Sequence, residues 1–456
     1  MNRISLLVLA LSALLTLLAP PAGSASNIPL HVAICSVRMV DGPALAVDLA
    51  TQGLSEDDGA PAGGVTVSIW LDGVPARASL SLIHMPARFV MNFDLAAGVV
   101  RVGGVPVGTF APVPPFSENL RFPVEVTVHR GMQAATARAE ATILLPTVIV
   151  PGYLNELAGP DQDLLATFGR LGYQDGGTSP TMFWFRYPSR QVTLEEGARS
   201  LAAYVRQVVL PAAYAVKINI VAYSVGGLIA RWNIAYDVDG WSSLVNRLVL
   251  VGVPNEGAVL AYVGNHAPSL LPFSGWARTP LAHSMIPTFP FWHEREQQPW
   301  NTPPDGRNSL LDRLNARPLP VGLRVYLFYA SHDPRNTGGS KTAAGLTGQL
   351  PGAAVSYEPG DGIVLAASAQ GLPVHGSRGV PALAERAVLR ADLGSVYHLS
   401  VLSAGGRRIG TALLDRFYST VDEAAKAPGT SSSAARPVMV NPGVGGSSAW
   451  GALLSR

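Results

Sequence analysis

The chain has 456 residues, of which 48% are hydrophobic and 14% are charged, and its formal net charge at pH 7 is +2. This length suggests two or three globular domains. The near-neutral balance has no run of lysine or arginine, which argues against a nucleic-acid-binding protein. The single cysteine, Cys35, excludes an internal disulfide, and we expect it to be a buried apolar side chain.

Residues 1–25 have the pattern of a secretory signal peptide. Arg3 supplies a positive end, residues 4–18 form an apolar run, and small residues follow two prolines up to Ala25. A membrane anchor is the alternative, but the apolar run is short for a spanning helix, which needs roughly 20 residues. We therefore expect cleavage after Ala25 and a secreted, extracellular protein.

Residues 26–145 are predicted to form a small all-β domain. Apolar and polar residues alternate over 65–71 and 124–129, as in strands with one buried face. Glycine- and proline-rich turns such as 58–64 separate the runs. The pattern predicts a sandwich-like domain, and a spacer, a surface-binding module and a folding partner remain open as its role.

Residues 146–421 have a different pattern, in which apolar strands alternate with helices. Strands are predicted over 147–150, 182–187, 217–223, 246–251 and 323–329, and helices over 161–171, 194–209 and 413–418. This alternation predicts an α/β domain whose mostly parallel sheet is covered by helices. Residues 422–456, rich in Ala, Ser, Gly and Pro, predict a flexible tail.

The most specific motif lies where the strand 217–223 ends at Ser224. Ala222 and Gly226 are small residues two positions before and after the serine, and helix-forming residues follow at once. Such a strand–turn–helix, the nucleophile elbow, exposes a serine hydroxyl and needs small neighbours. A chance small-x-Ser-x-Gly is the alternative, and the flanking strand and helix argue against it. Ser224 is therefore the candidate nucleophile.

A serine nucleophile of this type works with an acid and then a histidine later in the chain. Asp361 lies in a glycine-flanked loop, and Asp333 follows the strand 323–329; both are candidates for the acid. His398, late in the domain, is the preferred base, and His375 is the second candidate.

Two backbone N–H groups should stabilise the oxyanion that forms during attack on a carbonyl. One belongs to the residue after the nucleophile, Val225, and the other to a loop after an early strand. The loop 151–155 follows the strand 147–150, and the N–H of Tyr153 is the best candidate.

Together these motifs resemble an α/β-hydrolase of the lipase and lecithin:cholesterol acyltransferase-like group. The resemblance rests on residues 150–153, 223–227, 252–257 and 360–364, in the order of the family, and covers roughly residues 146–420. It implies an α/β-hydrolase fold and a serine carboxylic ester hydrolase that works through an acyl-enzyme. This chemistry needs no cofactor, no metal ligands are predicted, and a calcium site, found in some lipases, stays open. The resemblance also favours Asp361 and His398 as acid and base.

The chain departs from that family at two positions. Tyr223 precedes the serine where many relatives have histidine, and Pro151-Gly152 stands where many lipases have His-Gly. Neither departure removes a backbone donor. An acyltransferase using the same residues, and an inactive hydrolase-fold protein that binds surfaces, are the alternative functions.

Residues 258–320 are predicted to form an insertion rich in proline and aromatic residues. Such a segment forms either a mobile lid over an apolar acyl pocket or a fixed cap with a substrate groove. Both fit lipid or other acyl-ester substrates, and contact with a lipid interface is expected. The sequence leaves the oligomeric state open.

Overall fold

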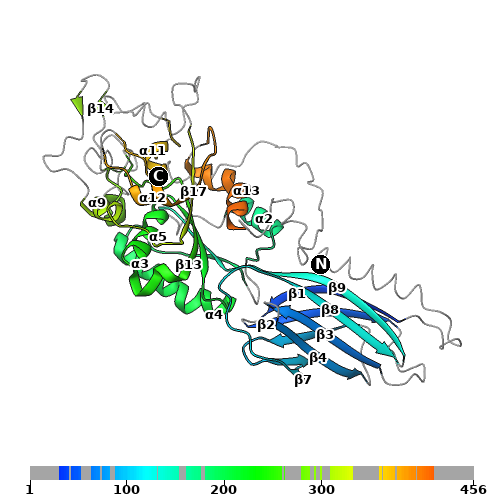
Figure 1. Cartoon of the computed structure of the whole chain (residues 1–456). Coiled ribbons are helices and arrows are strands. Elements are labelled where there is room, and N and C mark those ends of the chain that lie inside the picture. Colours follow the sequence, from blue (N-terminus) through cyan, green and yellow to red (C-terminus); the bar gives the residue numbers. More distant parts are fainter. Residues whose placement is uncertain are drawn as a thin grey trace. The chain divides into compact units, whose positions relative to one another are not determined.

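The chain divides into two compact units, whose elements Figure 1 labels. The computed structural model describes residues 30–40, 43–52, 63–71, 74–82, 88–130, 132–153, 161–175, 180–258, 261, 279–287, 292–293, 298–299, 309–331, 359–361, 363–374, 377–396 and 398–414. One unit comprises Met1–Arg38, Ala44–Val113 and Arg121–Ala141, and the other Met39–Pro43, Pro114–Leu120 and Thr142–Arg456. The predicted signal peptide, the predicted tail and most of the predicted insertion lie outside the described residues.

The first unit contains two β-sheets. One has the order β1 (His31–Val40), β2 (Ala44–Gln52), β5 (Arg88–Asp94), β6 (Val99–Val102), β7 (Val105–Thr109), and the other β4 (Val74–Leu82), β3 (Gly63–Leu71), β8 (Leu120–Arg130), β9 (Gln133–Ile143). β5 pairs antiparallel with β2 and β6, and β3 pairs antiparallel with β4 and β8. Short connections join β3 to β4 and β5 to β6, whereas the pairs β2–β5 and β3–β8 bring together strands that are far apart in the sequence.

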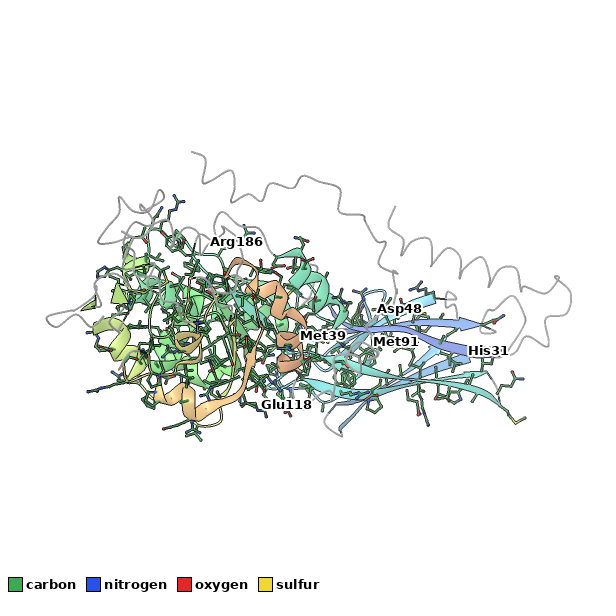
Figure 2. The ribbon with its side chains drawn as sticks, turned by 90° about the horizontal axis from the view of Figure 1, so that it is seen from above. His31, Met39, Asp48, Met91, Glu118 and Arg186 are labelled. Atoms are coloured by element: carbon green, nitrogen blue, oxygen red, sulfur yellow. The ribbon has the colours of Figure 1, made fainter. Side chains whose placement is uncertain are left out.

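Alternating burial gives each sheet one apolar face. β5 buries Phe89, Met91 and Phe93 at every second position, and β8 likewise buries Phe122 and Val124. Figure 2 labels Met91 among the side chains of this unit. Two sheets with one apolar face each form a sandwich-like unit, as predicted.

The prediction that Cys35 is buried is wrong. Cys35 is exposed in β1, as are Ala33 and His31, two and four residues earlier on the same face of the strand. Side chains two residues apart in a strand point to the same face, so the thiol of Cys35 lies on an exposed face of β1.

The second unit is built on a six-stranded sheet. Its order is β11 (Met182–Trp184), β10 (Thr147–Val150), β12 (Ile218–Tyr223), β13 (Val245–Val251), β16 (Arg324–Tyr329), β17 (Ala387–Asp392). All five neighbouring pairs are parallel. Parallel strands must be buried on both faces, which explains why β10 is buried at each of its four residues.

Helices cover both faces of this sheet. Val148, Ile220 and Leu248 belong to a buried cluster that also contains residues of α3 (Leu194–Tyr204) and α5 (Val225–Ala235). Their neighbours Ile149 and Val221 belong to a second cluster, with residues of α2 (Gln162–Arg170) and α13 (Val401–Leu413). Figure 1 shows the two helix pairs on opposite sides of the sheet.

Shorter elements complete the second unit. They are the π-helix η3 (Val205–Val209), α4 (Leu210–Ala213), η4 (Val238–Gly240), α6 (Trp241–Leu244), α8 (Pro280–His283), β14 (Trp292–His293), β15 (Gln298–Pro299), α9 (Ser309–Asn315), α11 (Ala366–Gln370), α12 (Pro381–Arg386) and η8 (His398–Ser400). None of the helices within the described ranges is long and apolar enough to cross a membrane.

Local sequence explains where the longer helices begin. Asp161 caps α2 by accepting from the N–H groups of Asp163 and Leu164. Thr193 and Glu196 form a capping box at α3, each side chain accepting a backbone N–H of the other residue. These caps satisfy donors that the first helical turn leaves without an intrahelical acceptor.

The last described helix is α13 (Val401–Leu413), which the sequence analysis did not predict over these residues. The helix predicted over 413–418 and the predicted domain end at 421 lie almost entirely outside the described residues. Gly405, Gly406 and Gly410 lower the helix propensity of this segment and obscure its pattern. A Cβ at Gly410 would lie 2.1 Å from Leu171 Cδ1, so the glycine allows close packing beside α2.

The fold class predicted from the sequence is confirmed in its architecture: a helix-covered parallel sheet, together with a smaller β unit.

Candidate active site

Ser224 stands at a sharp turn between β12 and α5. Its backbone has φ 54° and ψ −134°, a conformation that residues with a side chain rarely adopt. Gly226, two residues later, packs against the neighbouring strand β10, because a Cβ there would lie 2.3 Å from the carbonyl oxygen of Val150. The turn therefore has the geometry of a nucleophile elbow.

The structure brings Ser224, His398 and Asp361 together. His398 Nε2 lies 2.9 Å from Ser224 Oγ, and His398 Nδ1 lies 2.7 Å from Asp361 Oδ2. All three residues are buried, with exposed fractions of 8%, 5% and 1% in the same order. With Nδ1–H donating to the carboxylate, Nε2 is left as the acceptor for the serine hydroxyl.

The loop before α11 fixes the carboxylate of Asp361. Asp361 Oδ1 accepts the backbone N–H groups of Ile363 at 3.1 Å and Val364 at 2.8 Å, which leaves Oδ2 for the histidine. Gly252, with φ 55°, gives this carboxylate room, because a Cβ there would lie 3.0 Å from Oδ2. The other candidates, Asp333 and His375, lie outside the described residues.

The loop 151–153 lies against the serine. A Cβ on Gly152 would be 2.8 Å from Ser224 Cβ and 3.3 Å from its Oγ, so a residue with a side chain would crowd the hydroxyl. Val225 is the first residue of α5, and the first N–H groups of a helix have no intrahelical acceptor. The two predicted oxyanion donors therefore lie near the Ser224 hydroxyl. Tyr153 follows Gly152, which lies against that hydroxyl, and Val225 follows Ser224 itself.

Tyr187 holds this loop in place. Its buried hydroxyl lies 3.0 Å from the carbonyl oxygen of Pro151 and 3.2 Å from that of Gly152. A trans peptide directs its C=O and N–H to opposite sides, so the N–H of Tyr153 points away from Tyr187. On the outer side of the loop, the Tyr153 hydroxyl donates to Thr279 Oγ1 at 3.0 Å.

The sequence did not predict that two tyrosines, Tyr187 and Tyr223, form hydrogen bonds at the site. Tyr187 lies 35 positions from Gly152 in a strand-end sequence without any motif, and nothing in the sequence pairs the two. Tyr223 stood out only as a departure from the family pattern, yet its hydroxyl donates to the main-chain carbonyl of His398. A polar residue at this flanking position was the signal available.

Behind the elbow, a buried polar network surrounds Arg231 of α5. Its guanidinium donates to Asn255 Oδ1 at 2.8 Å and to Asn315 Oδ1 at 2.9 Å. The Asn315 amide donates to Glu256 Oε1 at 3.1 Å. Burial lowers the pKa of Arg231 to about 10, and the negative charge of Glu256 opposes that shift. The guanidinium is thus charged at neutral pH and neutralised in part by Glu256.

Within the described ranges, no three His, Cys, Asp or Glu side chains gather closely enough to hold a metal ion.

No family model matches the sequence, and no curated protein is similar to it. Among solved structures, the chain is similar to mature lipase BlEst2 from Bacillus licheniformis, with 16% identity over 60% of this chain and 92% of that chain and a TM-score of 0.41. Phospholipase PlaB from Legionella pneumophila is 14% identical over 49% of this chain and 44% of its own, with a TM-score of 0.33. An esterase from Pyrococcus furiosus is 11% identical over 68% of this chain and 96% of its own, with a TM-score of 0.31. The solved structures to which the chain is similar are thus a lipase, a phospholipase and an esterase.

Proposed function

We propose that this protein is a secreted serine carboxylic ester hydrolase, lipase-like or esterase-like, that acts on lipid or other acyl esters through an acyl-enzyme. The observation that carries the proposal is the chain of two hydrogen bonds from Ser224 through His398 to Asp361. Secretion is supported by the pattern of residues 1–25.

In the proposed reaction, Ser224 Oγ attacks the carbonyl carbon of the ester while its proton passes to His398 Nε2. Asp361 keeps the imidazole oriented and stabilises its positive charge. The carbonyl oxygen becomes an oxyanion, which the N–H groups of Val225 and Tyr153 stabilise. Loss of one such donor typically costs about 3 kcal/mol of transition-state stabilisation.

The tetrahedral intermediate then expels the alcohol, which takes the proton from His398 Nε2. This leaves an acyl-enzyme on Ser224. A water molecule gives a proton to the same nitrogen and attacks the acyl carbon. The second intermediate releases the carboxylic acid, and the serine recovers its proton.

The test is hydrolysis of p-nitrophenyl esters of graded acyl length by the wild type and Ser224→Ala. We expect Ser224→Ala to lower kcat/KM by at least about 10⁴-fold, because the nucleophile is lost. Ser403→Ala on α13, where the hydroxyl donates to the nearby carbonyl oxygen of Ser400, is the matched control and should keep full activity.

Activity retained by Ser224→Ala would contradict the proposed nucleophile, and a wild type inactive on every ester would contradict ester hydrolysis. Product analysis with an added alcohol measures transfer of the acyl group. Dominant transfer over hydrolysis would replace the hydrolase with an acyltransferase.

A further inference from the structure

Tyr223 connects the strand that carries the nucleophile to the segment that carries the histidine. It is the last residue of β12, directly before Ser224. Its hydroxyl donates to the main-chain carbonyl oxygen of His398 at 2.6 Å. The two rings lie side by side, with centroids 5.0 Å apart and planes tilted by 34°.

His398 is consequently held at its main chain as well as its ring. Its backbone N–H donates to the carbonyl oxygen of Asp361 at 2.8 Å, while its own carbonyl accepts from Tyr223. The ring nitrogens lie within hydrogen-bond distance of Asp361 Oδ2 and Ser224 Oγ. Asp361 thus holds the backbone of His398 from a loop, and Tyr223 holds it from the end of β12.

We propose that Tyr223 is a positioning residue for the base: its hydroxyl fixes the main chain of His398 so that Nε2 stays within reach of Ser224 Oγ. This inference rests on the proposed function. Tyr223 and Ser224 are adjacent in the chain. A displacement of the elbow therefore moves the nucleophilic hydroxyl of Ser224 together with Tyr223, which anchors His398.

The environment of Tyr223 suits a permanent donor. Burial, and to a smaller extent the negative charge of Asp361, raises the pKa of Tyr223 well above its ordinary value, so the hydroxyl remains protonated. The other edge of the ring faces the loop 151–153, because a Cβ on Gly152 would lie 3.2 Å from Tyr223 Cε1. The ring therefore contacts the surroundings of both the base and the predicted oxyanion donors.

The test compares Tyr223→Phe, which keeps the ring and removes the hydroxyl, with the wild type on one short-chain p-nitrophenyl ester. Without the hydrogen bond, His398 should spend less time in reach of Ser224. We expect kcat to fall about 5- to 20-fold with KM changed less than about 2-fold. Inactivation by an organophosphonate should slow by a similar factor, since it needs the same base.

Tyr173→Phe is the matched control. Tyr173 is a buried tyrosine of the same core cluster and packs on Phe168 with ring centroids 5.4 Å apart. Tyr173→Phe should keep the wild-type kcat, because Tyr173 packs on α2 and not beside the candidate catalytic residues, and the thermal stability of both variants is measured beside kcat. Rates are expressed per site titrated with the phosphonate, so that an incompletely folded preparation does not imitate a lower kcat.

Wild-type kcat and inactivation rate in Tyr223→Phe, or a raised KM with unchanged kcat, would overturn the positioning role. An equal fall of kcat in Tyr173→Phe would do the same, because it would reveal a general effect of lost core hydroxyls. Ser224→Ala, assayed beside them, separates the two levels of inference: if it remains active, the proposed function fails whatever Tyr223 does.

Discussion

At the scale of single residues, Ser224 combines a side chain with a backbone conformation that favours glycine. Its φ of 54° follows from the abrupt change from β12 to α5, and its N–H donates to the carbonyl of Val251 at 3.0 Å. Strain of this kind costs of order 1–3 kcal/mol and persists only where the surroundings enforce it. Here the close contact of Gly226 with Val150 is one such constraint.

This strain predicts a difference between two inactive variants. Ser224→Gly removes the hydroxyl and the Cβ, while Ser224→Ala keeps the Cβ in the unfavourable conformation. We expect Ser224→Gly to be more stable than Ser224→Ala by about 1 kcal/mol, because glycine tolerates positive φ. Urea unfolding of both proteins measures it, and equal midpoints would mean that the turn is not strained.

The sequence predicted the three polar residues that the structure brings together, although their catalytic roles stay predictions. Ser224 could be predicted because its motif depends on local steric demands, namely small residues that flank one tight turn. Asp361 and His398 followed from chain order and the family resemblance. The role of Tyr187 could not be predicted, because its contact with Gly152 depends on two parallel strands lying side by side, which no local pattern encodes.

At the scale of elements, the Arg231 network ties together segments that are distant in the sequence. It joins α5, which begins at the elbow, to Asn255 after β13 and to Asn315 at the end of α9. The Asn255 amide extends it to the carbonyl of Ala369 in α11, the helix that follows the Asp361 loop. The segment 252–257 thus serves as a buried junction between the nucleophile and acid regions.

Arg231→Met should therefore destabilise the protein strongly. The substitution leaves Glu256 without its compensating charge and two amide oxygens without a donor. Removing one partner of a buried charge pair typically costs about 3–5 kcal/mol. Denaturant unfolding measures the loss, with the exposed Arg199→Met on α3 as the control, which should change stability little. A small effect of Arg231→Met would mean that the buried charge is not compensated as described.

Most strands of the parallel sheet could be predicted, and the exceptions have physical reasons. β10, β12, β13 and β16 are apolar runs bounded by turns, which is the pattern of buried parallel strands. β17 was missed because it lies at the edge of the sheet, where Val388, Leu389 and Arg390 are all exposed and no alternation remains. β11 ends at Trp184, earlier than its apolar sequence predicts.

At the scale of the whole molecule, the two units are interleaved along the chain. Residues Pro114–Leu120 lie between β7 and β8 of the first unit, yet they belong to the second. Phe116 is buried there, pairs with Ala215 in a parallel bridge, and meets Tyr214 edge-on with ring centroids 5.9 Å apart. No pattern in the sequence distinguishes this segment from an ordinary loop between strands.

This assignment predicts which unit Phe116 stabilises. Calorimetric unfolding should show two transitions. The transition that Arg231→Met lowers is that of the larger unit, because Arg231 lies in it. Phe116→Ala should lower the same transition, by about 3–5 kcal/mol for a buried phenylalanine. Phe93→Ala, buried in the first unit, should lower the other transition. If Phe116→Ala and Phe93→Ala shift one transition together, the division into units is wrong.

The position of Phe116 also constrains the order of events during synthesis. The segment leaves the ribosome about 100 residues before its partners Tyr214, Ala215 and Val216, which takes roughly 5–20 s at ordinary elongation rates. The strands that flank it can pair in that interval, while the phenylalanine has no partner to pack against. A nascent chain paused between these points would thus present an unpaired aromatic side chain, the kind of surface that chaperones recognise.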